Sequence, residues 1–211
     1  MNLVQVHHSQ YFSLGYNYKS RWIGYYNQIK EIHNKEVKSI LEIGIGNGII
    51  ATFLENMNYN MVTVDIDKKL SPDIVSDINY LPFKTDTFDL IACFEVLEHL
   101  PYDQSISILK NMKNISKKHV IISIPDSTPF FRVGFILPII GKYEKVLPKF
   151  YRTNKLPKHK FDGEHYWEIG KKDYHLNKIV NDIKSIGFNI YSTYRMFENP
   201  YHRYFSLFKT S

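Results

Sequence analysis

Cysteine is almost absent from this sequence of 211 residues, which contains only Cys93. A single thiol excludes an internal disulfide framework and a zinc site built from cysteines. It fits a reducing compartment, so we expect a cytoplasmic protein, and we expect no metal site.

Long apolar runs are also lacking. The longest covers residues 130–140 and is interrupted by Arg132 and Pro138. A membrane-spanning helix needs roughly 20 apolar residues, so this stretch can lie on a membrane surface but cannot cross a bilayer. The first ten residues show no basic region followed by an apolar one, so we expect no secretory signal peptide.

The composition is ordinary for one folded domain, with 44% apolar and 23% charged residues. The net charge is +6, and much of the excess lies between Arg132 and Lys160. A basic balance permits a nucleic-acid or an anionic-membrane partner without demonstrating either. We expect no nucleic-acid partner, and we expect any peripheral membrane contact to involve residues 130–160.

Apolar runs alternate with amphipathic stretches from Val37 onward. Continuous apolar runs suit the strands of a parallel sheet covered on both faces, and their alternation with helices indicates a doubly wound α/β fold. The expected strands are 37–44, 60–67, 72–78, 88–95, 118–126, 188–197 and 202–210, and the expected helices are 49–57, 105–115 and 171–188.

Two segments depart from this rhythm. Residues 1–36 are rich in tyrosine and their second half has helical character, so we expect either a lid over a bound ligand or a helix packed on the sheet edge. Residues 127–165 contain several prolines and form an insertion within the main domain, 37–211. The insertion either packs on the sheet and hides its apolar residues or presents them to a lipid.

Three glycines, Gly44, Gly46 and Gly48, follow the first expected strand in LEIGIGNG. Glycine permits positive φ and has no Cβ to collide with a ligand, and open α/β sheets bind ligands beyond the carboxyl ends of their strands. The dinucleotide pattern G-x-G-x-x-G places its third glycine where Ile49 stands. Glu42, two residues before the first glycine, suits a ligand with an ammonium or sulfonium group.

Acidic residues end the next two expected strands. Asp65 is placed to accept the hydroxyls of a ribose, with Asp67 as a less favoured neighbour. Asp77 is placed to accept a hydrogen bond from an exocyclic amine such as that of adenine.

Together these motifs resemble those of the class I S-adenosylmethionine-dependent methyltransferases, and more narrowly the subgroup known as methyltransferase type 11 or 23. The resemblance is carried by LEIGIGNG, VDID, VSDINYLPFKTDTFDLIACFEVLEHL, VIISIPD, EHYWEIG and IKSIGF. It implies a Rossmann-like, mostly parallel sheet of seven strands, with the last strand antiparallel and helices on both faces. It also implies that S-adenosyl-L-methionine is the cofactor.

The resemblance assigns roles to individual residues. Glu42 would lie near the methionine part of the cofactor, with the three glycines lining the loop. Asp65 would bind the ribose, Asp77 would lie beside the adenine amine, and Phe94 would face the sulfonium. The remaining cofactor contacts would come from Ile66, Ile78 and Asn47, the last standing where the family often has threonine.

Two histidines are candidate catalytic bases. His99 follows the fourth strand and His165 follows the insertion, and each has a structural alternative as a cap, a packing residue or a tether. Tyr166 and Trp167 either line an acceptor site or belong to the core. Cys93 lies inside a predicted strand, which favours a core residue over a nucleophile.

The acceptor is less defined than the cofactor. FEVL after the fourth strand differs from the Asn/Asp-Pro-Pro-Tyr of amino-methylating DNA enzymes. We expect a small-molecule or a lipid- or glycan-linked acceptor. The alternatives are a non-catalytic S-adenosylmethionine-binding or interaction module and, less favoured, a nicotinamide-dependent oxidoreductase.

Overall fold

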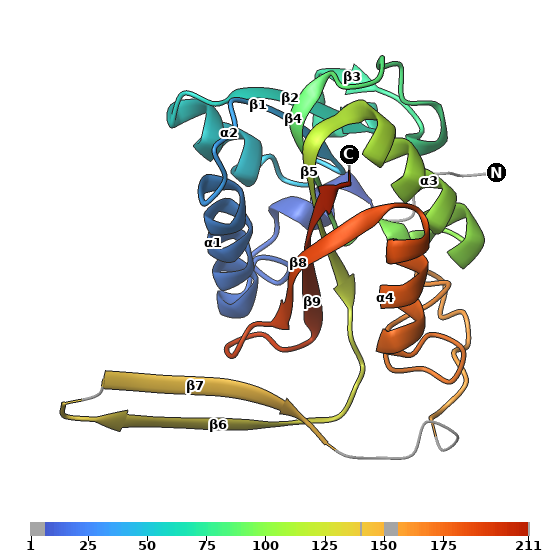
Figure 1. Cartoon of the computed structure of the whole chain (residues 1–211). Coiled ribbons are helices and arrows are strands. Elements are labelled where there is room, and N and C mark those ends of the chain that lie inside the picture. The colour runs from blue at the N-terminus through green and yellow to red at the C-terminus, as the bar shows by residue number, and fades with distance from the viewer. Residues whose placement is uncertain (1–6, 140, 150–155, 211) are drawn as a thin grey trace.

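The computed structural model describes residues 7–139, 141–149 and 156–210. Its main sheet has seven strands in the order β3-β2-β1-β4-β5-β9-β8 (Figure 1). Neighbouring strands from β3 to β5 are parallel, and β9 runs antiparallel to β5 and β8. This confirms the expected Rossmann-like sheet. Its strands are β1 (Ser39–Ile43), β2 (Asn60–Asp65), β3 (Ile74–Val75), β4 (Phe88–Phe94), β5 (Ser116–Pro125), β8 (Phe188–Arg195) and β9 (His202–Lys209).

Helices cover both faces of this sheet, as Figure 1 shows. Successive residues of a strand point to opposite faces. Ile40 therefore packs into the cluster containing residues of α1 and α2, while Leu41 packs into the cluster containing residues of α3 and α4. The helices are α1 (Lys19–His33), α2 (Ile49–Asn56), α3 (Tyr102–Ile115) and α4 (Leu176–Ser185).

Two elements are much shorter than the sequence predicts. β3 has only two residues, because Asp77 accepts a hydrogen bond from the backbone of Asn79 at 2.9 Å and turns the chain into a 3-10 helix. α4 begins at Leu176 rather than near residue 171. His175 caps its first turn by accepting from the Lys178 backbone N–H at 3.1 Å.

The described part of the N-terminal segment contains a short 3-10 helix, His8–Phe12, and then α1. α1 is tied to a strand that comes much later in the chain. Asn27 Nδ2 donates to the hydroxyl of Tyr194 on β8 at 2.8 Å, and this hydroxyl donates to Glu31 at 2.8 Å. Residues 1–6 of the expected lid lie outside the described residues.

The insertion forms a separate two-stranded hairpin of β6 (Phe130–Leu137) and β7 (Gly141–Pro148). Figure 1 shows the hairpin extending away from the main sheet. Residues 140 and 150–155 of the insertion lie outside the described residues. Across the described chain, no helix has the length and apolarity needed to cross a membrane.

Candidate active site

A cavity of about 730 Å³ opens at the carboxyl ends of β1, β2 and β4. All the site residues predicted from the sequence line it except Gly48. They are Glu42, Gly44, Gly46, Asn47, Asp65, Ile66, Asp77, Ile78, Phe94, His99 and His165. Parallel strands bring their carboxyl ends to one edge, so motifs distant in sequence meet here.

The turn after β1 depends on glycine at two positions. Gly44 has φ +83°, and a Cβ there would lie 2.5 Å from Cγ2 of Val96. Gly48 precedes α2 with φ +73° in the left-handed region, which other residues rarely adopt. Gly48 therefore shapes the turn and starts the helix instead of lining the cavity.

Glu42 is one of two buried carboxyls in the lining that have an unpartnered oxygen. Its side chain is buried, and its Oε2 atom has no hydrogen-bond partner. Burial raises the pKa of this carboxyl to about 8, because removal from water disfavours the charged form. An orphaned carboxylate oxygen in a residue that lines a cavity can bind a cationic group or a hydrogen-bond donor.

The carboxylate of Asp65 is held by the backbone. Its Oδ2 accepts from Ile45 N at 3.0 Å and its Oδ1 accepts from Asp67 N at 2.9 Å. Burial raises its pKa. An ionised carboxylate has about four acceptor positions, so these two bonds fix the group while leaving capacity for ligand hydroxyls. Asp77 also lines the cavity and accepts from the Asn79 backbone, which orients it in the same way.

The N-terminal segment closes one side of the cavity. Tyr11 lies against the glycine turn, its ring 3.6 Å from where a Cβ of Gly46 would be. Asn47 Nδ2 donates to Tyr25 Oη at 2.8 Å and to Asn17 Oδ1 at 2.9 Å. The side-chain amide of Asn47 therefore joins the glycine turn to this segment.

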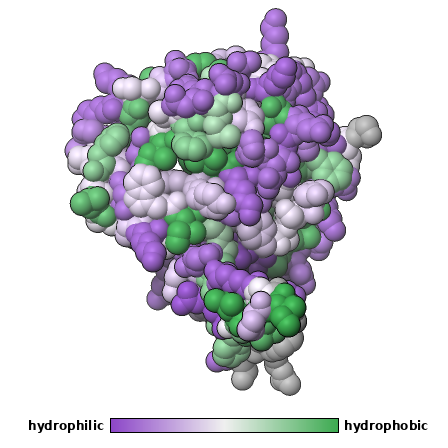
Figure 2. Space-filling model, turned by 90° about the vertical axis from the view of Figure 1, so that its left-hand side faces the viewer, coloured by the Kyte–Doolittle hydropathy of each residue, from purple (hydrophilic) through white to green (hydrophobic). Residues whose placement is uncertain are grey.

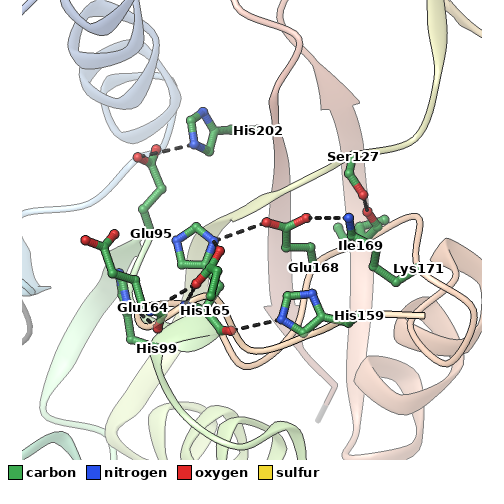
Figure 3. A network of polar contacts seen from close by, with 11 residues as sticks. Glu95, His99, Ser127, His159, Glu164, His165, Glu168, Ile169, Lys171 and His202 are labelled. Atoms are coloured by element: carbon green, nitrogen blue, oxygen red, sulfur yellow. Dashed lines mark hydrogen bonds and ion pairs between the residues drawn. The ribbon is translucent and has the colours of Figure 1, made fainter. Parts of the chain in front are cut away.

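Glu95, which the sequence analysis missed, lies in the lining just beyond β4. Its carboxylate pairs with Arg21 of α1 at 3.3 Å. It also pairs with His202 of β9 at 3.5 Å, as Figure 3 shows. Its φ of +56° is uncommon for a residue with a side chain. Its position directly after Phe94 could have indicated that Glu95 belongs to the site. No local sequence feature indicated Arg21 or His202.

The two candidate bases are neighbours, with ring centroids 5.1 Å apart. His99 Nδ1 lies 3.1 Å from the carbonyl oxygen of Glu164. A carbonyl only accepts, so Nδ1 carries the proton and Nε2 has the lone pair. Burial lowers the pKa of His99, which favours the neutral ring needed to take up a proton. His165 Nδ1 lies 3.2 Å from Glu168, and this hydrogen bond raises its pKa.

Beside the histidines lies a second buried carboxyl, Glu98. It is 1% exposed, its Oε2 atom lacks a hydrogen-bond partner, and burial raises its pKa to about 8. One oxygen of Glu98 and one ring nitrogen each of His99 and His165 lie within 4.8 Å of one another. Two imidazole nitrogens and a carboxylate can bind a divalent transition metal, so these residues offer a donor set that the expectation of no metal did not foresee.

The structure decides between core and site for three further residues of the sequence analysis. Cys93 is fully buried in β4, and burial raises the pKa of its thiol, so it is a core residue. Trp167 is also core, and its indole N–H donates to Leu97 O at 3.2 Å. Tyr166 lines the cavity.

Comparisons with known proteins agree with this geometry. A family model described as "Methyltransferase domain" matches residues 15–169. An uncharacterised protein of Methanocaldococcus jannaschii is 32% identical over 107 residues, which is 47% of each chain. The mitochondrial ubiquinone biosynthesis O-methyltransferase of Schizosaccharomyces pombe is 26% identical over 176 residues, covering 72% of this chain and 59% of that protein. The chain thus spans about half the length of these curated relatives.

The fold has counterparts among solved structures. The S-adenosylmethionine dependent methyltransferase from Mesorhizobium loti superposes with a TM-score of 0.60 at 14% identity, covering 87% of this chain and 97% of that one. At this identity the likeness concerns the fold.

Proposed function

This chain belongs to the class I S-adenosylmethionine-dependent methyltransferase family, and from that premise we propose that it transfers a methyl group to a small-molecule or a lipid- or glycan-linked acceptor. The observation that carries the proposal is the cavity at the strand ends, in which the glycine turn meets the carboxylates of Glu42, Asp65 and Asp77.

The residues fit S-adenosylmethionine. The unpartnered oxygen of Glu42 suits the cationic methionine end of this cofactor. Asp65, already oriented by two backbone N–H groups, suits the ribose hydroxyls. Asp77 suits the adenine amine. Ile66 and Ile78 would pack on the adenine and Phe94 would face the sulfur, with Asn47 supporting the turn.

The cofactor would supply an activated methyl group on a cationic sulfur. The protein would hold the acceptor in line with that methyl and exclude water, which can account for much of the rate enhancement. His99 would accept the proton that an acceptor hydroxyl loses, through the nitrogen that does not face Glu164. His165, held by Glu168, would touch the acceptor or order the cleft.

The wall formed by Glu98, His99 and His165 supports a second way of activating an acceptor. These residues would hold a divalent cation, and the orphaned oxygen of Glu98 favours this reading. A cation there would act as a Lewis acid toward an acceptor oxygen. Turnover that a chelator lowers and added Zn²⁺ or another divalent transition metal restores would support this reading, and turnover that a chelator leaves unchanged would refute it.

The remaining parts of the proposal concern the acceptor, the lid and the place of the protein in the cell. Several relatives are named as ubiquinone biosynthesis O-methyltransferases, which favours an oxygen of a lipid-linked or aromatic acceptor. Residues 1–36 would act as a lid on the cofactor, in keeping with the contact of Tyr11 with the glycine turn. The lone buried thiol favours the cytoplasm, and residues 130–160 would make a peripheral membrane contact.

Calorimetry with S-adenosylmethionine and with NAD is the first test. We expect only S-adenosylmethionine to bind, and a preference for NAD would favour an oxidoreductase. Asp65→Asn should weaken cofactor binding about 10- to 100-fold, because hydrogen bonds to a charged group contribute about 1.5–3 kcal/mol. Asp89→Asn is the matched control, since Asp89 binds the backbone of Lys38 and Ser39 at the opposite end of the sheet.

A screen of acceptors for release of S-adenosylhomocysteine is the second test. Release above the rate without acceptor identifies the substrate class. If the cofactor binds and no acceptor of the three classes supports turnover, the chain is instead a non-catalytic binding module.

A further inference from the structure

The β6–β7 hairpin exposes an apolar face. In the pairing of the two strands, Phe131 lies opposite Leu147 and Phe135 lies opposite Tyr143, on the same side of the hairpin. Val133 and Leu137 share this side, and these six residues, here named the apolar face, are 39–55% exposed. A two-stranded hairpin alone is marginally stable in water, and a contiguous apolar patch usually marks an interaction site.

The tip of the hairpin is apolar as well. Residues 133–141 read VGFILPIIG and contain no charged or hydrogen-bonding side chain. Ile136 is 74% exposed and Ile139 is 98% exposed. Hairpin turns in water are normally rich in Gly, Asn, Asp and Ser. Figure 2, viewed from the side toward which the hairpin points, shows hydrophobic side chains gathered at the lower end of the molecule.

Positive charge is concentrated in the hairpin and in the sequence that follows it. Residues 130–160 contain eight Lys or Arg residues and one acid, Glu144, for a net charge of +7. The whole chain has +6, so the rest of it has −1. Lys142 follows the tip directly and pairs with Glu144 at 2.8 Å. Lys145 lies opposite Val133 within the apolar face, and Lys149 lies over the ring of Phe131 at 5.9 Å.

The other side of the hairpin is attached to the body near the strand ends. Phe130 packs edge-on against Tyr201, with ring centroids 5.8 Å apart, and lies under the guanidinium of Arg195 at 4.5 Å. A Cβ at Gly134 would lie 3.1 Å from Cζ of Phe197. These contacts leave the apolar face directed away from the body.

We propose that the tip of this hairpin inserts into the surface of an anionic lipid bilayer and that the apolar face lies along this surface, with the cations of the hairpin at the level of the headgroups. Ile139, at the tip, is about three residues beyond the Ile136–Lys142 pair, or roughly 10 Å of strand. This matches the roughly 5–10 Å to which interfacial segments insert. This inference rests on the lipid-linked acceptor in the proposed function and extends it to a membrane surface. Vesicle binding can be measured without turnover, so the two proposals are tested separately.

Co-sedimentation with vesicles is the test. The full chain should bind vesicles of equal parts phosphatidylglycerol and phosphatidylcholine at low salt. Binding should fall at least tenfold on pure phosphatidylcholine or in 0.5 M NaCl, because each cation near an anionic surface strengthens binding by about fivefold. Ile139→Asp should weaken binding at least tenfold. Val75→Asp, which places the same charge on another exposed aliphatic residue, should change it less than twofold.

The lipid proposal is overturned if the protein ignores anionic vesicles at low salt, or if Ile139→Asp and Val75→Asp bind alike. It is also overturned if the protein forms a dimer that Ile139→Asp dissociates and does not bind vesicles, because a second copy then covers the face. Vesicle binding without turnover on any acceptor would refute the proposed function and leave the lipid proposal standing.

Discussion

From the raised pKa of the buried Glu42 carboxyl we predict that cofactor affinity rises with pH. Its carboxyl has a pKa of about 8 in the cofactor-free protein, so about 1% is ionised at pH 6 and about 9% at pH 7. A cationic group beside the orphaned oxygen would favour the ionised form and lower this pKa. Affinity should therefore rise severalfold, and at most about ninefold, between pH 6 and pH 7, as ionisation before binding becomes less unfavourable.

The energies involved also predict the pH at which Glu42 strengthens cofactor binding. Hydrogen bonds to charged groups contribute about 1.5–3 kcal/mol. Ionising Glu42 costs about 1.4 kcal/mol at pH 7 and about 2.7 kcal/mol at pH 6. The net contribution should be below about 2 kcal/mol at pH 7 and close to zero at pH 6. Glu42→Gln should thus weaken binding by up to about 15-fold at pH 7 and hardly at all at pH 6.

Isothermal titration with S-adenosylhomocysteine from pH 6 to pH 7.5 is the assay. The α-amino group of this ligand stays protonated across this range, so the ligand remains cationic throughout. Glu42→Gln serves as the control that removes the titrating group. Equal affinities of the native protein across this range, or the same slope in Glu42→Gln, would refute the reasoning.

The other predictions concern the bases, the lid and the sheet. His99→Ala should lower turnover by about 100-fold or more, and if neither it nor His165→Ala lowers turnover more than tenfold, both base assignments fail. Cofactor should slow proteolysis within residues 7–30, and unchanged cleavage would argue against a lid. Asp89 has a lowered pKa because Lys117 and the β1 backbone hydrogen-bond to it. Its stabilisation is present above pH 4 and is lost as the pH falls. Asp89→Asn should therefore lower the Tm by about 2–4 °C at pH 7, a modest effect because the pair is exposed, and this difference should shrink progressively in melts below pH 4.

The cavity lining near β1 and β2 could be predicted because its signals are local. Each carboxylate directly precedes a turn or ends an apolar strand, and parallel strands bring such ends together without any knowledge of distant contacts. The two-residue β3 shows the limit of this reasoning. The side chain of Asp77 turns the chain into a 3-10 helix, and a run of apolar residues does not reveal that bond.

The other wall of the cavity could not be predicted because its groups meet only in the folded chain. Arg21, Glu95 and His202 come from α1, the end of β4 and the start of β9. Glu98 reads as a surface residue beside His99, yet the fold buries it. The hairpin was equally hidden, since the composition of residues 127–165 left open whether its apolar side chains face the sheet or the solvent.

The bond between α1 and β8 has a consequence for the order of folding. Asn27 and Glu31 find their partner, Tyr194, more than 160 residues later in the chain. Such distant contacts form late. During synthesis the side of α1 that carries Asn27 and Glu31 therefore stays uncovered until β8 has left the ribosome. A chain stalled before that strand should attract chaperones through its earliest helix.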